Sequence, residues 1–342
     1  MPRLSGIVPF DASQIHSEEY DWLIMQHLNI LISIVIPLYN KGAYIGKTLD
    51  SVLNQSFDKW EALVVDDGST DFGPEIVQKY VDADPRIRLI SKKNGGVSSA
   101  RNVGIAHSQG VAICFLDADD EWLPGHLSEI WRLRQSYPKA ELFFDQAIVK
   151  KNGKYRKHKW YSECKSEGYL FSYADELAKC PNLINSSNVA ISKSLLNRTK
   201  TWFMEEDSIG EDLELWLRLS LDCYVAFSSS EGAIYNRDVE VNARNSNSVH
   251  YPRGYLMLIN QLLTSGELDD STCKSLQSVR DRKTVAYIFS LISSGNRNEA
   301  RLQLSKWSPA SSYSRCKPLL RIACCFPSSL IRAVVATRMR LL

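Results

Sequence analysis

Residues 31–71 read LISIVIPLYNKGAYIGKTLDSVLNQSFDKWEALVVDDGSTD and decide the fold class, because two β-branched runs flank one amphipathic segment. The runs at 32–36 and 62–65 predict buried strands, and apolar side chains at helical spacing predict a helix over 44–55. The alternation continues with expected helices at 75–81, 97–107 and 124–135 and expected strands at 87–90 and 111–116. Four successive strand–helix units predict an α/β fold with a mostly parallel sheet and right-handed crossovers.

The regular alternation ends near residue 137. Runs at 141–149 and 155–161 flank Asn152-Gly153, a two-residue turn signal, and predict a β-hairpin. Beyond residue 245 the apolar spacing becomes helical, with helices expected at 255–263, 274–291 and 298–304. We therefore expect an N-terminal extension at 1–30, a catalytic-type domain at 31–245 and a helical C-terminal region at 246–342.

The net charge of +2 over 342 residues hides an uneven distribution. Residues 301–342 contain eight basic and no acidic side chains, so this tail carries +8 and the first 300 residues carry −6. With 44% hydrophobic and 23% charged residues, the chain is an ordinary globular protein rather than a disordered or collagen-like one. Eight cysteines without metal-like CxxC spacing, in a chain of this size, favour a reducing, cytoplasmic setting.

Residues 22–40 carry no formal charge over about the length that crosses a bilayer, so a membrane span must be considered. Polar side chains interrupt this segment, and its second half is a β-branched run ending at Pro37, which predicts a buried strand instead. The N-terminus has no uninterrupted apolar region, so we expect no signal peptide.

Polar and turn-forming residues follow each of the four predicted strands. In chain order they are Pro37, Tyr39 and Asn40; Asp66 to Asp71; Asn94, Gly95, Gly96 and Arg101; and Asp117, Asp119 and Asp120. Ligands of open parallel sheets bind outside the carboxyl ends of the strands. Because all four clusters fall at that edge, the sequence predicts a ligand site there.

The segment Asp117-Ala-Asp119-Asp120 follows a buried run directly. Carboxylates this close repel one another unless they share a proton or bind a cation. Oxygen ligands favour Mg²⁺ or Mn²⁺, which are commonly held by one or two carboxylates together with substrate phosphates. The alternative is an acidic N-cap for the following helix, and this interpretation suits Asp120.

The other clusters admit two interpretations each. Residues 66–71 could form an ordinary turn and helix cap, or Asp66 and Asp67 could accept hydrogen bonds from a base or ribose. Residues 94–102 place backbone amides at a helix start, where anions are favoured. Glu211 and Asp212 could be an ordinary acidic first turn, or a general base if folding brings them to the sheet. The absence of GxGxxG and P-loop patterns argues against NAD enzymes and P-loop ATPases.

Five segments, in this order and spacing, resemble the motifs of family-2 glycosyltransferases, which have the GT-A fold. They are residues 35–40 (VIPLYN), 65–71 (VDDGSTD), 94–102 (NGGVSSARN), 117–119 (DAD) and 210–212 (GED). The resemblance covers roughly residues 31–245. It implies inverting transfer of a sugar from a nucleoside diphosphate, usually UDP, to an acceptor hydroxyl, with Mn²⁺ or Mg²⁺ as cofactor.

The resemblance also implies a role for each matching residue. Pro37 and Tyr39 would line the base and ribose pocket, and Asp67 would meet the uracil. The expected nucleotide-binding set is Pro37, Tyr39, Asn40, Asp66, Asp67, Asn94, Gly96, Arg101 and Asp117. Asp119, with Asp117, would bind the metal, while Asp212 would be the catalytic base with Glu211 beside it.

Two other classes of protein compete with this interpretation. A nucleotidyltransferase would carry a glycine-rich basic loop after the first strand, where this chain has Pro37-Leu-Tyr-Asn40. A non-catalytic nucleotide-sugar-binding protein would have no need of both Asp119 and Asp212. The basic run at 150–159 is typical of a solvated hairpin or of a face toward an anionic acceptor, and we expect no nucleic-acid partner.

The acceptor is expected to be lipid-linked or an oligosaccharide, because the family resemblance suggests bacterial surface polysaccharide or lipopolysaccharide assembly. Aromatic residues between 155 and 205 are either sugar-stacking or core side chains: Trp160, Tyr161, Tyr169, Tyr173 and Trp202. The apolar, arginine-containing tail at 311–342 either docks on an anionic membrane surface at the cytoplasmic face or caps the catalytic domain.

Overall fold

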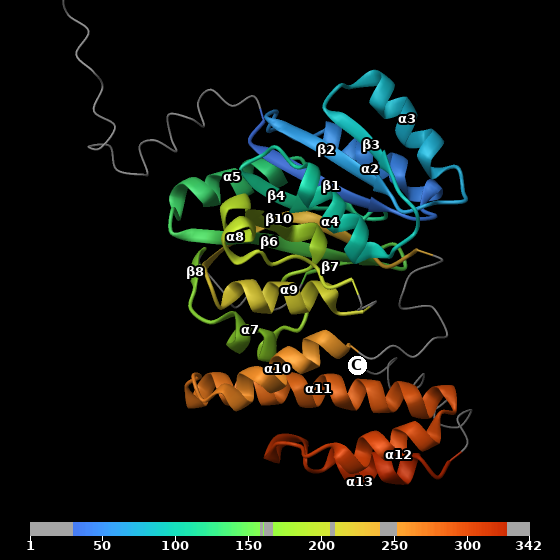
Figure 1. The fold of residues 1–342 in the computed structure, drawn as a ribbon, viewed down its shortest axis with the longest axis vertical. Helices are drawn as coiled ribbons and strands as arrows, with labels where there is room; N and C mark the ends of the chain where they lie inside the picture. The colour runs from blue at the N-terminus through green and yellow to red at the C-terminus, as the bar shows by residue number, and fades with distance from the viewer. Residues whose placement is uncertain (1–29, 158–159, 161–166, 206–208, 240–251, 327–342) are drawn as a thin grey trace, which may run out of the picture.

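The computed structural model describes residues 30–157, 160, 167–205, 209–239 and 252–326. Nearly all of the expected N-terminal extension, the end of the C-terminal tail and Tyr161 therefore lie outside the described residues. In the described part of the chain, strands form one sheet in the order β3-β2-β1-β4-β9-β6-β10-β5. Figure 1 shows this sheet with helices on both faces and the C-terminal helices stacked beyond one of them.

The first half of the sheet is parallel, as the sequence predicts. Its strands are β1 (Ile32–Leu38), β2 (Trp60–Asp66), β3 (Ile87–Ser91) and β4 (Ala112–Phe115). The connecting helices are α2 (Gly42–Leu53), α3 (Gly73–Ala83) and α4 (Val97–His107). Strands β1 and β2 are buried along almost their whole length, which explains their uninterrupted β-branched runs. The α/β fold class is confirmed.

The second half of the sheet mixes directions. Its strands are β5 (Glu121–Trp122), β6 (Ala140–Lys151), β9 (Val189–Ser192) and β10 (Tyr224–Asn236). Strand β9 runs antiparallel between β4 and β6, whereas β10 is parallel to β6. At the edges, β7 (Lys154–Arg156) pairs with β6 and β8 (Gly168–Leu170) pairs with β10. The predicted hairpin turn is confirmed, with Asn152 and Gly153 both at positive φ, but its second strand ends at Arg156, short of the expected range of 155–161.

Two apolar layers cover the sheet. One face packs against α2, α3 and α5 (His126–Ser136). The other packs against α4, α7 (Tyr173–Lys179), α8 (Lys193–Thr199) and α9 (Glu211–Ser220). The core therefore lies on both sides of the strands, and the carboxyl ends of β1, β2 and β4 stay at the rim.

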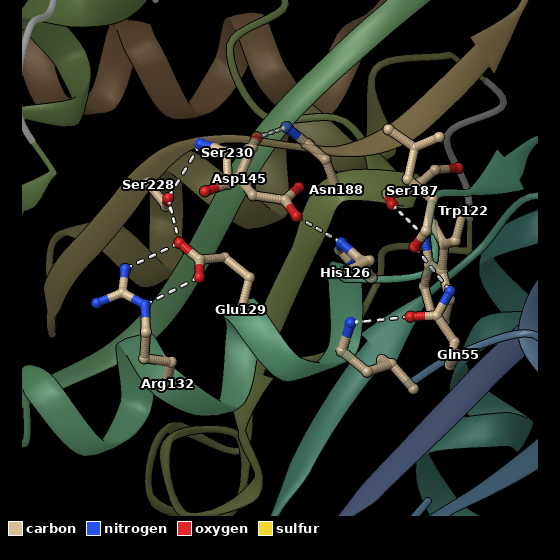
Figure 2. Close-up of polar contacts among 12 residues, drawn as sticks. Gln55, Trp122, His126, Glu129, Arg132, Asp145, Ser187, Asn188, Ser228 and Ser230 are labelled. Atoms are coloured by element: carbon tan, nitrogen blue, oxygen red, sulfur yellow. Dashed lines mark hydrogen bonds and ion pairs between the residues drawn. The ribbon is translucent and has the colours of Figure 1, made fainter. Parts of the chain in front are cut away.

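A polar cluster joins α5 to β6 and β10 inside the molecule. His126 Nδ1 lies 2.6 Å from Asp145 Oδ2, and both side chains are completely buried. Figure 2 shows this pair beside Glu129, whose carboxylate accepts hydrogen bonds from Arg132 and Ser228. The cluster fixes α5 against the second half of the sheet.

The C-terminal region is helical, as predicted. It contains α10 (Arg253–Ser265), α11 (Asp270–Ser294), α12 (Arg297–Lys306), a short 3-10 turn η3 (Ser311–Tyr313) and α13 (Cys316–Ala323). Arg282 of α11 donates to the backbone oxygens of Leu177 and Ala178 and thereby caps the C-terminus of α7. Helices α12 and α13 pack on α11 around a separate apolar cluster, on the side away from the sheet (Figure 1). No helix among the described residues is long and apolar enough to cross a membrane.

Candidate functional site

The loops after β1 and β2 are joined by hydrogen bonds. The Asn40 backbone N–H donates to Ser69 Oγ at 3.1 Å, and the Thr70 N–H donates to Asn40 Oδ1 at 2.8 Å. Asn40 adopts a positive φ of 51°, a conformation that asparagine tolerates better than most residues. Asp71 then accepts hydrogen bonds from the N–H groups of Gly42 and Gly73, at the first residues of α2 and α3. The two loops form one rigid rim.

Asp67 organises the glycine loop after β3. Its buried carboxylate accepts hydrogen bonds from the backbone N–H groups of Gly95 (2.9 Å) and Gly96 (2.8 Å). Lys92 Nζ lies 2.5 Å from the same group, and Asn94 Nδ2 donates to the Asp67 carbonyl oxygen. Asp67 therefore sets the start of α4, and its contact with a uracil base remains a prediction.

The acidic loop after β4 is held from three directions. Thr48 Oγ1 of α2 donates to the backbone oxygens of Ala118 and Asp120. Buried Asp120 accepts hydrogen bonds from Ser187 Oγ at 2.6 Å and from the backbone N–H of Asn236 at 2.8 Å. The prediction that Asp120 caps the next helix is wrong, because α5 begins at His126 after Gly125. Asp120 instead joins the end of β4 to η2 (Ser186–Asn188) and to the end of β10.

Asp119 faces the rim and meets Lys41, with 2.5 Å between Lys41 Nζ and Asp119 Oδ2. Burial raises the pKa of Asp119, the Lys41 ammonium opposes that rise, and the neighbouring Asp117 carboxylate adds to it. Ionisation of both Asp117 and Asp119 is therefore unfavourable unless a cation lies close to them.

The acidic loop offers an oxygen donor set of the kind that binds divalent cations. Asp117 and Asp119 offer carboxylate oxygens at one strand end, which are the ligands that Mg²⁺ and Mn²⁺ prefer. Within the described ranges, no group of three or more His, Cys, Asp or Glu side chains is placed to hold a metal ion. Two carboxylates at one strand end are a donor set of the kind that Mg²⁺ uses together with substrate phosphates and water.

Arg101 connects the acidic loop to the helix that begins with Glu211 and Asp212. Its guanidinium donates to Asp117 Oδ1 at 2.8 Å and to Glu211 Oε1 at 2.9 Å, and it lies over the Phe203 ring. The side chain is almost completely buried. Folding thus brings the segment at 210–212 to the sheet edge, more than 90 residues along the chain from Asp117.

The two acids at the start of α9 have different surroundings. Glu211 is buried against Arg101, and burial raises its pKa, with Asp212 adding to the rise and Arg101 opposing it. Asp212 is partly exposed, and the hydrogen bond that its carboxylate accepts comes from the adjacent Leu213 N–H at 2.8 Å. Asp212 is therefore the acid with room to accept a proton from another molecule.

Comparison with protein families gives a match for the first part of the chain. Residues 33–197 match the model of Glycosyl transferase family 2. These residues are a family-2 glycosyltransferase domain. The match covers the motifs after β1 to β4 and stops before the segment at 210–212.

Curated relatives of this glycosyltransferase domain come from several bacteria. TuaG of Bacillus subtilis, a glycosyltransferase named for teichuronic acid biosynthesis, is 28% identical over 204 residues, which are 59% of this chain and 76% of TuaG. The chondroitin synthase of Pasteurella multocida is 43% identical over 90 residues, which are 26% of this chain and 9% of the synthase. The chain likewise covers only 26% of Bacillus subtilis EpsJ, at 44% identity.

Solved structures share the GT-A fold over nearly the whole chain. S. aureus TarS 1–349 in complex with UDP-GlcNAc superposes with a TM-score of 0.62 at 17% identity and covers 91% of this chain and 92% of that one. The mannosyltransferase PcManGT of Pyrobaculum calidifontis, solved with GDP-Man and Mn²⁺, gives 0.56 at 16% identity, with coverage of 90% and 93%. The helical C-terminal region thus belongs to the part of the chain that these superpositions cover.

The remaining predicted residues of the glycosyltransferase domain lie at the rim. Tyr39 is half-exposed at the end of β1, with Pro37 partly buried just before it. Asp66 accepts a hydrogen bond from the Ser69 N–H at 2.9 Å, and Asn94 and Gly96 are exposed in the glycine loop. The rim therefore keeps an open aromatic ring and backbone amides on neighbouring loops.

The aromatic candidates for acceptor binding divide into two groups. Trp160 and Tyr173 are core side chains, and Tyr169 packs edge-on against Tyr137 at the surface. Trp202 is partly exposed beside the start of the segment that precedes α9. Of the described candidates, Tyr169 and Trp202 have exposed rings, and stacking on a sugar stays a prediction for these two.

Sequence reasoning missed Lys41, Lys92 and Ser187. Lys41 and Lys92 pair with Asp119 and Asp67, and Ser187 Oγ bonds Asp120 while accepting from the Asp117 N–H at 3.2 Å. Both lysines stand next to predicted motifs, which was the available signal. Ser187 lies in an irregular segment with no comparable signal in the sequence.

Proposed function

We propose that the protein transfers a sugar from a nucleoside diphosphate, with UDP as the expected nucleotide, to an acceptor hydroxyl with inversion at the anomeric carbon. One observation carries the proposal: Arg101 bridges Asp117 and Glu211, so the acidic loop and the acids at the start of α9 share one sheet edge. The family-2 match supplies the reaction class.

The donor nucleotide would lie across the rim formed by the loops after β1, β2 and β3. Tyr39 and Pro37 offer an aromatic and apolar surface for the base, while Asn40, Asp66 and Asp67 offer polar groups for the base and ribose. The exposed glycine loop at Asn94 and Gly96 leads into the start of α4, where an anionic group is favoured, although the Gly96 N–H itself donates to Asp67. That TarS binds UDP-GlcNAc and PcManGT binds GDP-Man supports a nucleotide-sugar donor.

Asp119, together with Asp117, would hold Mn²⁺ or Mg²⁺. When bound, the cation neutralises the charge that develops on the diphosphate leaving group. Thr48, Ser187 and the backbone of Asn236 fix the acidic loop, so its carboxylates need little reorganisation. Lys41 and Arg101 already balance part of the negative charge on this loop.

Asp212 would accept the proton of the acceptor hydroxyl as that oxygen attacks the anomeric carbon. An alcohol is a weak nucleophile, and a positioned carboxylate contributes about 10²–10⁴-fold to such a step. Glu211 would hold this end of α9 in place through Arg101 rather than take the proton itself. Attack opposite the leaving group inverts the anomeric centre without a covalent intermediate on the protein.

The acceptor would be a lipid-linked or oligosaccharide hydroxyl in surface polysaccharide assembly, a role supported by the similarity to TuaG, which is named for teichuronic acid biosynthesis. The described start of the basic tail, α13, exposes apolar side chains beside arginines. We infer that this surface rests on an anionic membrane at the cytoplasmic face, which would bring the enzyme to such an acceptor.

The proposal is tested by incubating the protein with a panel of UDP- and GDP-sugars and Mn²⁺ and measuring release of the nucleoside diphosphate. Slow hydrolysis of one donor, accelerated by a lipid-linked or oligosaccharide acceptor, is the expected result. Tight donor binding without hydrolysis or transfer under any condition would favour a non-catalytic nucleotide-sugar-binding protein. Pyrophosphate-dependent formation of a nucleoside triphosphate would instead favour a nucleotidyltransferase.

A further inference from the structure

The ammonium group of Lys41 lies on the carboxylate expected to bind the metal. Lys41 Nζ is 2.5 Å from Asp119 Oδ2, and the two side chains are only 18% and 16% exposed. The ammonium also lies 5.8 Å from the centre of the Tyr44 ring. This close ion pair is largely shielded from solvent, and its acid is the proposed metal ligand.

The backbone that carries Lys41 is fixed independently of this ion pair. Asn40, just before it, is bonded to Ser69 and Thr70, and the Gly42 N–H donates to Asp71 at 2.7 Å. The carbonyl oxygen of Lys41 accepts the N–H groups of Tyr44 and Ile45 at the start of α2. The hydrogen-bonded loop therefore holds the backbone of Lys41 at a fixed place beside Asp119.

A divalent cation and an ammonium cannot share Asp119 without cost. Two positive charges within a few ångströms repel strongly where the surroundings exclude water. Asp117, the second carboxylate expected to bind the metal, already forms an ion pair with Arg101. Any cation that binds here must therefore displace Lys41 or bind against its charge.

We propose that Lys41 is an internal counter-ion of Asp119 that the divalent cation must displace, so that the lysine sets the metal affinity of the site and links it to the donor. The inference rests on the proposed metal site at Asp119. When a nucleoside diphosphate binds, its phosphates provide a new anionic partner for the displaced ammonium. Metal and nucleotide then strengthen each other's binding, and this coupling is reciprocal.

The test is a titration of Mn²⁺ binding, followed by the electron paramagnetic resonance signal of the free ion, with and without UDP. Without nucleotide, Lys41→Met should bind Mn²⁺ about tenfold more tightly than the unmodified protein, the scale of removing a partly buried like charge. UDP should strengthen Mn²⁺ binding less in Lys41→Met than in the unmodified protein. Lys41→Arg, which keeps the charge, should behave like the unmodified protein.

Lys47→Met is the matched control, because it removes an exposed lysine from α2, the helix that Lys41 precedes, and should leave Mn²⁺ binding unchanged. Equal Mn²⁺ affinity of Lys41→Met and the unmodified protein, with both melting normally, overturns the role of Lys41 and leaves the metal site intact. If neither protein binds Mn²⁺ even with UDP, or if Asp119→Asn binds it normally, the metal site itself is wrong and this inference falls with it.

Discussion

At the scale of single residues, the adjacent acids Glu211 and Asp212 differ in their burial and in their hydrogen-bond partners. Glu211 is buried and bonded to Arg101, whereas Asp212 is partly exposed and bonded only within its own helix start among the contacts described. The residues alone placed both acids in one helical turn, and only the family resemblance singled out Asp212, because burial and the partner Arg101 arise from the tertiary fold.

Asp212→Asn should lower turnover by about 10² or more, because the amide cannot take the proton of the acceptor hydroxyl. Binding of the UDP-sugar should persist, since the change keeps the shape of the side chain. Steady-state transfer and calorimetric donor binding measure the two effects. Asp222→Asn, at an exposed position just after α9, is the control and should keep normal turnover. Normal turnover of Asp212→Asn would show that the base is another group.

Arg101→Met should destabilise the fold by about 3–5 kcal/mol, because it leaves the buried Glu211 carboxylate without its cationic partner. Urea denaturation measures the change in the free energy of unfolding. Arg198→Met removes an arginine paired with Glu141 at the surface and should cost less than about 1 kcal/mol. Similar losses for the two variants would mean that Arg101 gives no more stability than a surface ion pair.

At the scale of elements, the first half of the sheet was predictable, whereas in the second half only the hairpin of β6 and β7 was. Strands β1 to β4 are contiguous apolar runs joined by amphipathic helices, so each is visible in a short window of sequence. Strand β9 is only four residues long, and its place between β4 and β6 depends on partners far away in the chain. The role of Asp120 was missed for the same reason, since Ser187 and Asn236 lie 67 and 116 residues away.

Strand β10 depends on a glycine where it crosses the buried His126–Asp145 pair. A Cβ atom at Gly232 would lie 1.6 Å from Asp145 Oδ2 and 2.5 Å from His126 Nδ1, so Gly232→Ala must push the pair apart. We expect a loss of about 3–5 kcal/mol in the free energy of unfolding, the scale for breaking a buried pair. Figure 2 shows the hydrogen bonds that join His126 to Asp145 and Glu129 to Ser228 in this cluster.

The control for this substitution is Gly125→Ala, because Gly125 has φ −89° and nothing within 4 Å of the added methyl group. Thermal and urea denaturation should place it within about 0.5 kcal/mol of the unmodified protein. A Gly232→Ala protein as stable as the control would show that β10 can shift away from the pair at little cost.

At the scale of the whole molecule, the acidic body and the basic tail have separate places. Helices α10 and α11 pack on the catalytic layer, so the helices that cover the domain precede the tail at 311–342 for which capping was the alternative. Helices α12 and α13 lie beyond them, at the end of the molecule farthest from the sheet (Figure 1). The basic tail thus begins on a surface that the catalytic core does not need for its own packing.

Helix α13 buries Leu320 against α11 and α12, yet its opposite side exposes Leu319 by 65% and Ile322 by 56%. Arg315 and Arg321 are exposed beside them. Such a surface gains free energy on an anionic bilayer from apolar burial and from the attraction of each arginine, about 1 kcal/mol per charge. The full-length protein should therefore sediment with vesicles containing phosphatidylglycerol, and less so as salt is raised.

The double variant Leu319→Glu/Ile322→Glu should lower this vesicle binding about tenfold or more, because it removes the apolar contact and adds like charge to the lipid. Met257→Glu, at an exposed apolar position on α10, is the matched control and should bind as before. Donor hydrolysis in solution should be equal in all three proteins, because α13 packs away from the sheet edge that carries Asp119 and Asp212. Unchanged vesicle binding of the double variant would show that Leu319 and Ile322 do not contribute to membrane binding. Helix α13 would then only pack on α11 and α12.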